Sequence, residues 1–333
     1  MIVYEPSYYE SFRCLASDCP DNCCKEWDVL VDNEAIARFQ KVPGVLGEAL
    51  KKNIYTENGE SYIAFNGGKC PFLRTDGLCG LQTELGEEML CNTCRTYPRI
   101  HHDYGDFQEL ELELSCPEAA RIILSSPVEP RIAKEVPGGE EPGYDRRAME
   151  ILKASRKAIL DFLQEPGYSV AQQLQMLLLY AYEVDEALNY FPEDPLEPFC
   201  ADNYQDAGLP EMPGTMEDIF RFYADLEILT DEWKQRLAAG PVENGWDPRM
   251  TRLIRYFVER YWLQAVSDLD LASRAKFIVI SCLVIRHMGG DLCRAAQLYS
   301  KEIENDAENM DAILDGSFMS PEFRDAVLLR LLK

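Results

Sequence analysis

The chain has 333 residues, of which 47% are hydrophobic and 27% are charged, a profile typical of a folded globular protein that argues against wholesale disorder. Its 58 acidic and 33 basic residues give a net charge of −25, so phosphate backbones would be repelled and nucleic acid is not an expected partner. The first residues, MIVYEPSYYE, lack the basic patch and apolar stretch of a secretory signal, and the longest apolar run, Phe277 to Ile285, is too short to cross a bilayer. We therefore expect a cytoplasmic protein without membrane insertion.

Cysteine is concentrated at the start of the chain, where nine of the 12 cysteines lie at or before Cys116. They fall in three strings, FRCLASDCPDNCCKEW, KCPFLRTDGLCG and LCNTCRTYPR, followed by a single cysteine in LSCPEAA. In a reducing compartment, clustered cysteines bind metal more often than they form disulfides. The expected metal ligands are Cys19, Cys23, Cys24, Cys70, Cys79, Cys91, Cys94 and Cys116.

The cysteines do not by themselves identify the metal, because four thiolates suit both structural zinc and an iron–sulfur cluster. Nine cysteines exceed one four-ligand site, so there are either two centres or several thiols outside the ligand set. The adjacent Cys23-Cys24 pair and the long gaps do not match the paired CxxC motifs of a zinc ribbon. This favours an iron–sulfur cluster, with zinc as the alternative.

One strand is predicted at the end of the cysteine-rich part, over residues 107 to 115, FQELELELS. Leucines at 110, 112 and 114 alternate with glutamates at 109, 111 and 113, which predicts one buried and one solvated face. The following residues 127–144 contain PVEP and VPGGEEPG, a composition typical of a linker. The expected domains are therefore a cysteine-rich metal module, 1–126, and a second domain, 145–333.

From about residue 145 the apolar residues recur at helical spacing. Thr215 and Asp218 predict a capping pair, Pro248 fits the first turn of another helix, and Gly289-Gly290 can end the helix that contains the long apolar run. A further helix is expected over 292–303. The fold class is mainly α: a small cysteine-rich region with a little β, followed by an irregular, all-helical domain.

The cysteine strings resemble the flagellin lysine-N-methylase family. The family pattern places CP-x-x-CC-x-x-W, CPFL…GLC and C-x-x-C-x-x-YPR in this order, and all three occur here between Cys19 and Arg99, followed by Cys116-Pro117. The resemblance covers about the first third of the chain, and parts of it are also similar to a broader family of zinc- or iron-chelating proteins. It implies transfer of a methyl group from S-adenosylmethionine to lysine side chains of flagellin or another lysine-bearing protein, with a required iron–sulfur cluster, expected to be of the 4Fe-4S type. A GxGxxG-type donor loop is not visible in the sequence.

Methyl transfer to lysine needs a deprotonated amine, which a carboxylate, a tyrosine or a desolvated pocket can supply. Polar residues beside the cysteines are Arg95, Tyr97, Arg99, His101 and His102. Arg95 and Arg99 are candidates for binding the carboxylate of the methyl donor, or alternatively for offsetting the negative charge of the thiolates. Adjacent histidines point to opposite sides of a strand, so at most one would face the centre.

Two other functions fit the same cysteines. One is a non-catalytic metal-binding protein with a helical interaction domain, and the other is a redox or electron-transfer protein. The sequence leaves the catalytic residues, the donor site and the number of centres open.

Overall fold

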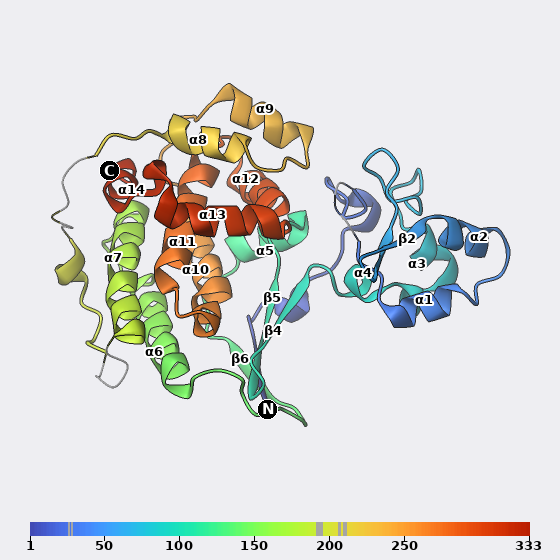
Figure 1. The fold of residues 1–333 in the computed structure, drawn as a ribbon, viewed down its shortest axis with the longest axis horizontal. Helices are drawn as coiled ribbons and strands as arrows, with labels where there is room; N and C mark the ends of the chain where they lie inside the picture. The colour runs from blue at the N-terminus through green and yellow to red at the C-terminus, as the bar shows by residue number, and fades with distance from the viewer. Residues whose placement is uncertain (26, 28, 191–195, 206–207, 209–211) are drawn as a thin grey trace.

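The computed structural model describes residues 1–25, 27, 29–190, 196–205, 208 and 212–333. The protein is mainly α, as predicted. A larger helical body is joined to a smaller lobe that carries the short helices of the cysteine-rich region (Figure 1). Within these described residues, no helix is both long and apolar enough to cross a membrane.

Four long helices form the centre of the larger body: α6 (Arg146–Phe162), α7 (Val170–Asn189), α10 (Met250–Tyr261) and α11 (Leu271–His287). Helix α11 contains the apolar run of the sequence, and its residues Phe277 to Ile285 are all buried, as expected for a central helix. Shorter helices surround it (Figure 1): α5 (Pro117–Ser125), α8 (Met216–Ala224), α9 (Asp231–Ala239), α12 (Leu292–Tyr299), α13 (Ala307–Met319) and α14 (Asp325–Leu331).

The helix ends follow the local sequence closely. Thr215 and Asp218 form the predicted capping box at the start of α8. Helix α10 begins at Met250, two residues after Pro248, and Gly289 follows the end of α11 with φ of +70°. The helix predicted over 292–303 is present: α12 continues from Tyr299 into a wider, π-helical turn at Ser300–Glu304.

A four-stranded sheet lies beside the helices, in the order β4-β5-β1-β6. The strands are β1 (Ile2–Glu5), β4 (Arg99–Asp103), β5 (Phe107–Leu112) and β6 (Ile132–Glu135). Strand β1 runs parallel to β5 and antiparallel to β6, and β4 pairs with β5 as a hairpin. The segment predicted as a linker, 127–144, therefore contributes an edge strand to this sheet.

The smaller lobe contains α1 (Asn33–Phe39), α2 (Gly44–Lys52), the hairpin β2–β3 (Ile54–Glu57, Glu60–Ile63), α3 (Gly80–Leu85) and α4 (Asn92–Thr96). It has its own hydrophobic cluster, whose buried members come from residues 29–91. Residues on both sides of this segment, among them Phe12 and Leu114, belong to the large cluster of the helical body. The division into domains 1–126 and 145–333 stays a prediction.

The prediction of a solvated glutamate face on the strand is wrong. Glu109, Glu111 and Glu113 are 2%, 3% and 7% exposed, and the regular strand ends at Leu112. Buried carboxylates are stable only when paired, and these three meet arginines that lie far away in the sequence. The alternation of the strand was visible in the sequence, but those arginines were not.

Candidate metal centre

The predicted cysteine ligands come from five places in the fold. Cys19, Cys23 and Cys24 lie in the loop before α1, and Cys70 lies in a turn that precedes α3. Cys79, Cys91 and Cys116 are the N-cap residues of α3, α4 and α5, and Cys94 lies within α4. A helix N-terminus carries partial positive charge, which favours a thiolate over a thiol. All eight cysteines are free of disulfides.

The structure brings these thiols together around Cys23 and Cys24. The thiol of Cys24 lies within hydrogen-bonding reach of the sulfur atoms of Cys23 and Cys70, and the thiol of Cys94 lies within reach of Cys91. These contacts raise the pKa of Cys24 and Cys94 and lower the pKa of Cys23, Cys70 and Cys91. The five thiols thus form two groups, Cys23, Cys24 and Cys70 in one and Cys91 and Cys94 in the other.

The remaining predicted ligands border these groups. Cys19, Cys79 and Cys116 each interact electrostatically with Cys23. Burial raises the pKa of all three, that of Cys116 to about 12. A bound cation would reverse this effect, since metal ligation deprotonates a thiol outright. The donor set, free soft sulfur atoms at helix N-termini, fits the chemistry of an iron–sulfur or zinc centre.

Over the part of the chain that the structure describes, no three side chains of His, Cys, Asp or Glu stand as a ready-made ligand set for one metal ion. The identity of the metal and the ligation by the eight cysteines stay predictions.

Asp21, between Cys19 and Cys23, connects the cysteine loop to the helical body. Its carboxylate accepts hydrogen bonds from Arg294 Nη1 at 2.9 Å and Gln297 Nε2 at 3.0 Å, and Lys301 Nζ lies 3.3 Å away. Gln297 also donates to the carbonyl of Ser115, next to Cys116, at 2.8 Å. Burial alone would raise the pKa of Asp21, but Lys301 and Arg294 hold it below its usual value.

Sequence reasoning missed this contact, which we call the Asp21 clamp and define by Asp21, Arg294, Gln297 and Lys301. Asp21 is separated from its three partners by more than 270 residues of sequence. The only available signal was the spacing of polar residues at 294, 297 and 301, which places them on one face of a helix.

The two arginines proposed for the donor or the thiolates are engaged elsewhere. Arg95 is exposed and donates to Asn92 Oδ1 at 3.3 Å. The guanidinium of Arg99 lies over the rings of Tyr9 and Phe12, 5.7 and 5.2 Å from their centroids. Their role in donor binding stays a prediction, whereas Arg294 and Lys301 of the helical body are the cations placed at the cysteine loop.

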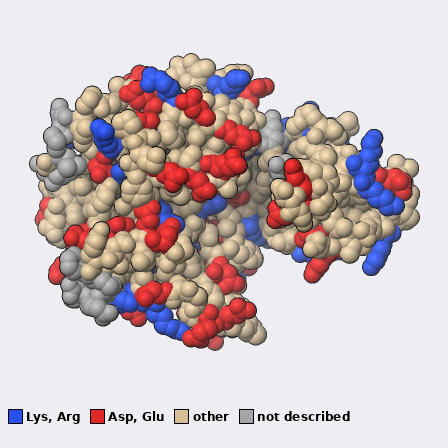
Figure 2. Space-filling view, viewed as in Figure 1, with Lys and Arg blue, Asp and Glu red and all other residues tan. Residues whose placement is uncertain are grey.

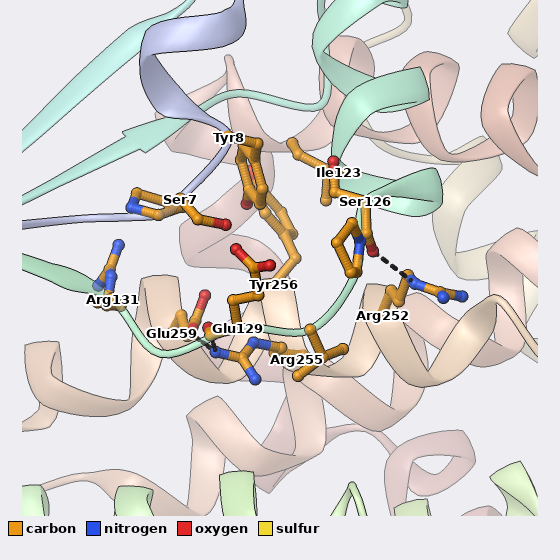
Figure 3. Close-up of a pocket in the computed structure, with 13 residues that line it drawn as sticks. Ser7, Tyr8, Ile123, Ser126, Glu129, Arg131, Arg252, Arg255, Tyr256 and Glu259 are labelled. Atoms are coloured by element: carbon orange, nitrogen blue, oxygen red, sulfur yellow. Dashed lines mark hydrogen bonds and ion pairs between the residues drawn. The ribbon is translucent and has the colours of Figure 1, made fainter.

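The buried glutamates of β5 and the segment after it form a row that leads toward the cysteines. Glu109 makes a bidentate pair with Arg156 at 2.5 and 2.7 Å, and Arg131 Nη2 lies 3.1 Å from Glu111. Although burial raises the pKa of Glu111, His102 and Arg131 lower it to about 2. Beside Glu111, Arg131 also borders a small cavity of about 30 Å³ that is shared with Tyr8 and is wide enough for water (Figure 3).

Glu113 ends this row beside the cysteine centre. Burial raises its pKa to about 7, against the opposing effect of Arg260, which lies 3.7 Å away. Its carboxylate hydrogen-bonds to Ser115, whose hydroxyl also contacts the Tyr97 hydroxyl at 3.0 Å. The Tyr97 ring packs on Trp27 of the cysteine loop, with centroids 5.3 Å apart.

A wide cleft of about 1240 Å³ opens at the β4–β5 hairpin. One wall is the hairpin, including His102 and Asp103, and the opposite wall includes Gln264 and Arg274. Acidic residues of the segment before α6, Glu140, Glu141 and Asp145, also line it. Acidic side chains are spread over much of the molecular face shown in Figure 2, consistent with the net charge.

The fold and the site define a class of protein: a mainly helical protein whose cysteine-rich lobe is fixed to the helical body. No model of a protein family and no solved structure matches the chain. It is 35% identical over 133 residues to the lysine-N-methylase of Salmonella choleraesuis, covering 38% of this chain and 33% of that protein. It is equally similar to the flagellar biosynthetic protein FliU of Salmonella muenchen, of which it covers 78%.

These similarities show that the chain belongs to the flagellin lysine-N-methylase family. The matched part spans about a third of the length of the two lysine-N-methylases, from Salmonella choleraesuis and Salmonella typhimurium.

Proposed function

We propose that the protein is a protein-lysine N-methyltransferase that uses S-adenosylmethionine, carries an iron–sulfur cluster and acts on flagellin. The relatives named lysine-N-methylase support the reaction class. The observation that most supports a cluster is that free thiols gather around Cys23, in a lobe that the Asp21 clamp fixes to the helical body.

The cysteines that would hold the cluster are the two groups Cys23, Cys24, Cys70 and Cys91, Cys94, with Cys19, Cys79 and Cys116 at their edge. When bound, an iron–sulfur cluster supplies one-electron chemistry and an electrophilic iron. The chain itself contributes Lys301, which pairs with Asp21 and whose positive charge also lowers the pKa of Cys23, so it favours a thiolate there.

The methyl transfer has a simple balance. The amine nitrogen of lysine forms a bond to the methyl carbon as the carbon–sulfur bond of the sulfonium breaks, and the donor leaves as a neutral thioether. The ammonium form of lysine has no free electron pair, so a proton must leave before this step. The protein must therefore provide a base and a place for a cationic side chain.

The test is an anaerobic preparation analysed for iron, sulfide and zinc, followed by an assay with methyl-labelled donor and purified flagellin. We expect stoichiometric iron and sulfide, and label on flagellin lysines. Stoichiometric zinc without turnover would instead support the non-catalytic metal-binding function. A reversible chromophore without methylation would support an electron-transfer protein.

A matched pair of variants connects the cysteines to the activity. Cys94→Ala removes a thiol from the centre, whereas Cys200→Ala removes an exposed thiol of the helical body. We expect the first variant to lose iron and methyl transfer together and the second to keep both. Equal iron content in both would overturn the ligand assignment.

A further inference from the structure

Resting on the proposed function, we propose that the cleft at the β4–β5 hairpin binds the substrate lysine, and that His102, supported by Glu111, accepts the proton from its ammonium group. The assignment starts from the contact between these two side chains. His102 Nε2 and Glu111 Oε2 lie 3.7 Å apart, and both atoms are buried without a hydrogen-bond partner among the described residues. The His102 side chain keeps 16% of its surface exposed and lines the cleft.

Glu111 is held in the charged form that such a base requires. Its other oxygen, Oε1, accepts a hydrogen bond from Arg131 at 3.1 Å, and its backbone in β5 pairs with Ile100 of β4. A fixed carboxylate behind an imidazole orients the ring and stabilises the imidazolium that forms when the ring takes a proton. Histidine is also the side chain that exchanges protons near neutral pH.

The cleft itself is suited to a cationic, flexible side chain. Asp103, Glu140, Glu141 and Asp145 bring carboxylates to its walls, while the lining cation Arg274 is paired with Asp268 at 2.9 Å. These carboxylates have structural partners as well, such as Arg146 for Glu141 at 2.9 Å, so they supply a negative field rather than a closed ion cage. A volume of about 1240 Å³ admits a peptide segment together with its lysine.

The same buried row joins this base to the cysteine centre. Glu111 and Glu113 are two residues apart in extended chain, a distance of about 7 Å, and Glu113 hydrogen-bonds to Ser115 next to Cys116. Arg260 interacts with both carboxylates, so the row of buried charges extends from the cleft toward the thiols.

In the proposed step the lysine ammonium gives one proton to the neutral imidazole of His102, and the imidazolium pairs with the Glu111 carboxylate. The lysine amine is then neutral and carries the free electron pair that methyl transfer needs. The charged groups that face His102 are Glu109 and Glu111 of β5, Arg131 behind them, Asp103 on its own strand and Arg274 across the cleft.

The first arm of the test measures binding and does not depend on turnover. The probes are a short flagellin peptide with one lysine and the same peptide with that lysine acetylated, titrated calorimetrically into the full chain. We expect the lysine peptide to bind at least about 10-fold tighter, because acetylation removes the charge. Glu140→Gln with Glu141→Gln should lower this preference, whereas Glu34→Gln with Glu48→Gln, two exposed carboxylates of the smaller lobe, should not. An unchanged preference in the cleft variant would overturn the proposal.

The second arm measures the base. His102→Gln is expected to keep its iron content and melting temperature but to lose about 100-fold in kcat near pH 7, with recovery toward high pH, where lysine deprotonates unaided. Added imidazole should restore part of the rate, which a purely structural role would not allow. If the wild type methylates lysine and His102→Gln is equally active, His102 is not the base, while the proposed methyltransferase function stands. A wild-type chain without lysine methylation would refute the proposed function instead, and the binding arm would then decide the cleft.

Discussion

The smaller lobe and the helical body are held together by different physical means. The body has a continuous apolar core in which α11 is buried on every side, with large rings such as Phe257 and Phe277 in contact. The lobe has a cluster of only 12 buried side chains, and three of its four α-helices have five to seven residues. Short helices around so small a core gain little from apolar burial. The comparison predicts that the body folds through its hydrophobic core, whereas the lobe needs a metal bound to its cysteines.

The sharpest test of this difference is removal of the centre. Cys70→Ala with Cys94→Ala should abolish metal binding and unfold the lobe, because the free energy of binding a structural metal, about 10 kcal/mol, contributes directly to folding. The helical body should stay folded. Hydrogen exchange should therefore show lost protection in α1–α4 and native protection in α11. If exchange in the lobe stays native in the metal-free variant, the lobe does not depend on its centre.

The converse test weakens the body. Phe277 is buried and its ring packs against Phe257 and Tyr261, with centroids 5.9 and 5.1 Å apart. Phe277→Ala should lower the free energy of unfolding of the body by about 3–5 kcal/mol, measured by urea denaturation. Metal content should stay at the wild-type value in native buffer. Loss of metal from Phe277→Ala in native buffer, without urea, would show that the lobe takes its stability from the body.

The two regions also differ in how far their structure followed from sequence. In the body, periodicity and capping residues such as Thr215 and Asp218 predicted the helices, because local patterns determine where they start and end. In the lobe, cysteine spacing predicted the thiol centre but neither Asp21 nor its partners Arg294 and Lys301. Contacts between residues so far apart depend on the tertiary fold, which no local pattern contains. The same reason explains the wrong assignment of the β5 glutamates to solvent.

The Asp21 clamp tests whether the regions are energetically coupled. Asp21→Asn removes the negative charge that Asp21 presents to Arg294 and to the buried Lys301, so we expect a loss of about 2–3 kcal/mol in the free energy of unfolding. The cysteine loop should exchange its amide hydrogens faster, since its anchor on α12 is weakened. Asp18→Asn, two residues before Pro20 and exposed, is the matched control and should match the wild type in both measurements. Equal behaviour of the two variants would mean that the clamp does not couple the regions.

Glu113 gives the smallest expected effect but reports on the junction itself, where the chain leaves the lobe and enters the body. Burial raises the pKa of this carboxyl to about 7, above its unfolded value near 4.5. The native state therefore binds more protons than the unfolded state between these two values, and the contribution of Glu113 to stability is lost as pH rises through about 7.

The Glu113→Gln variant tests this, because its side chain stays neutral at every pH. From pH 5 to pH 7.5, the free energy of unfolding measured by urea titration should fall by about 2 kcal/mol less in Glu113→Gln than in the wild type. The control Glu34→Gln removes an exposed carboxylate of α1 and should follow the wild-type pH dependence. A wild-type-like profile in Glu113→Gln would show that Arg260 keeps the carboxylate charged in the native protein, and the junction would then be an ion pair rather than a site that takes up protons.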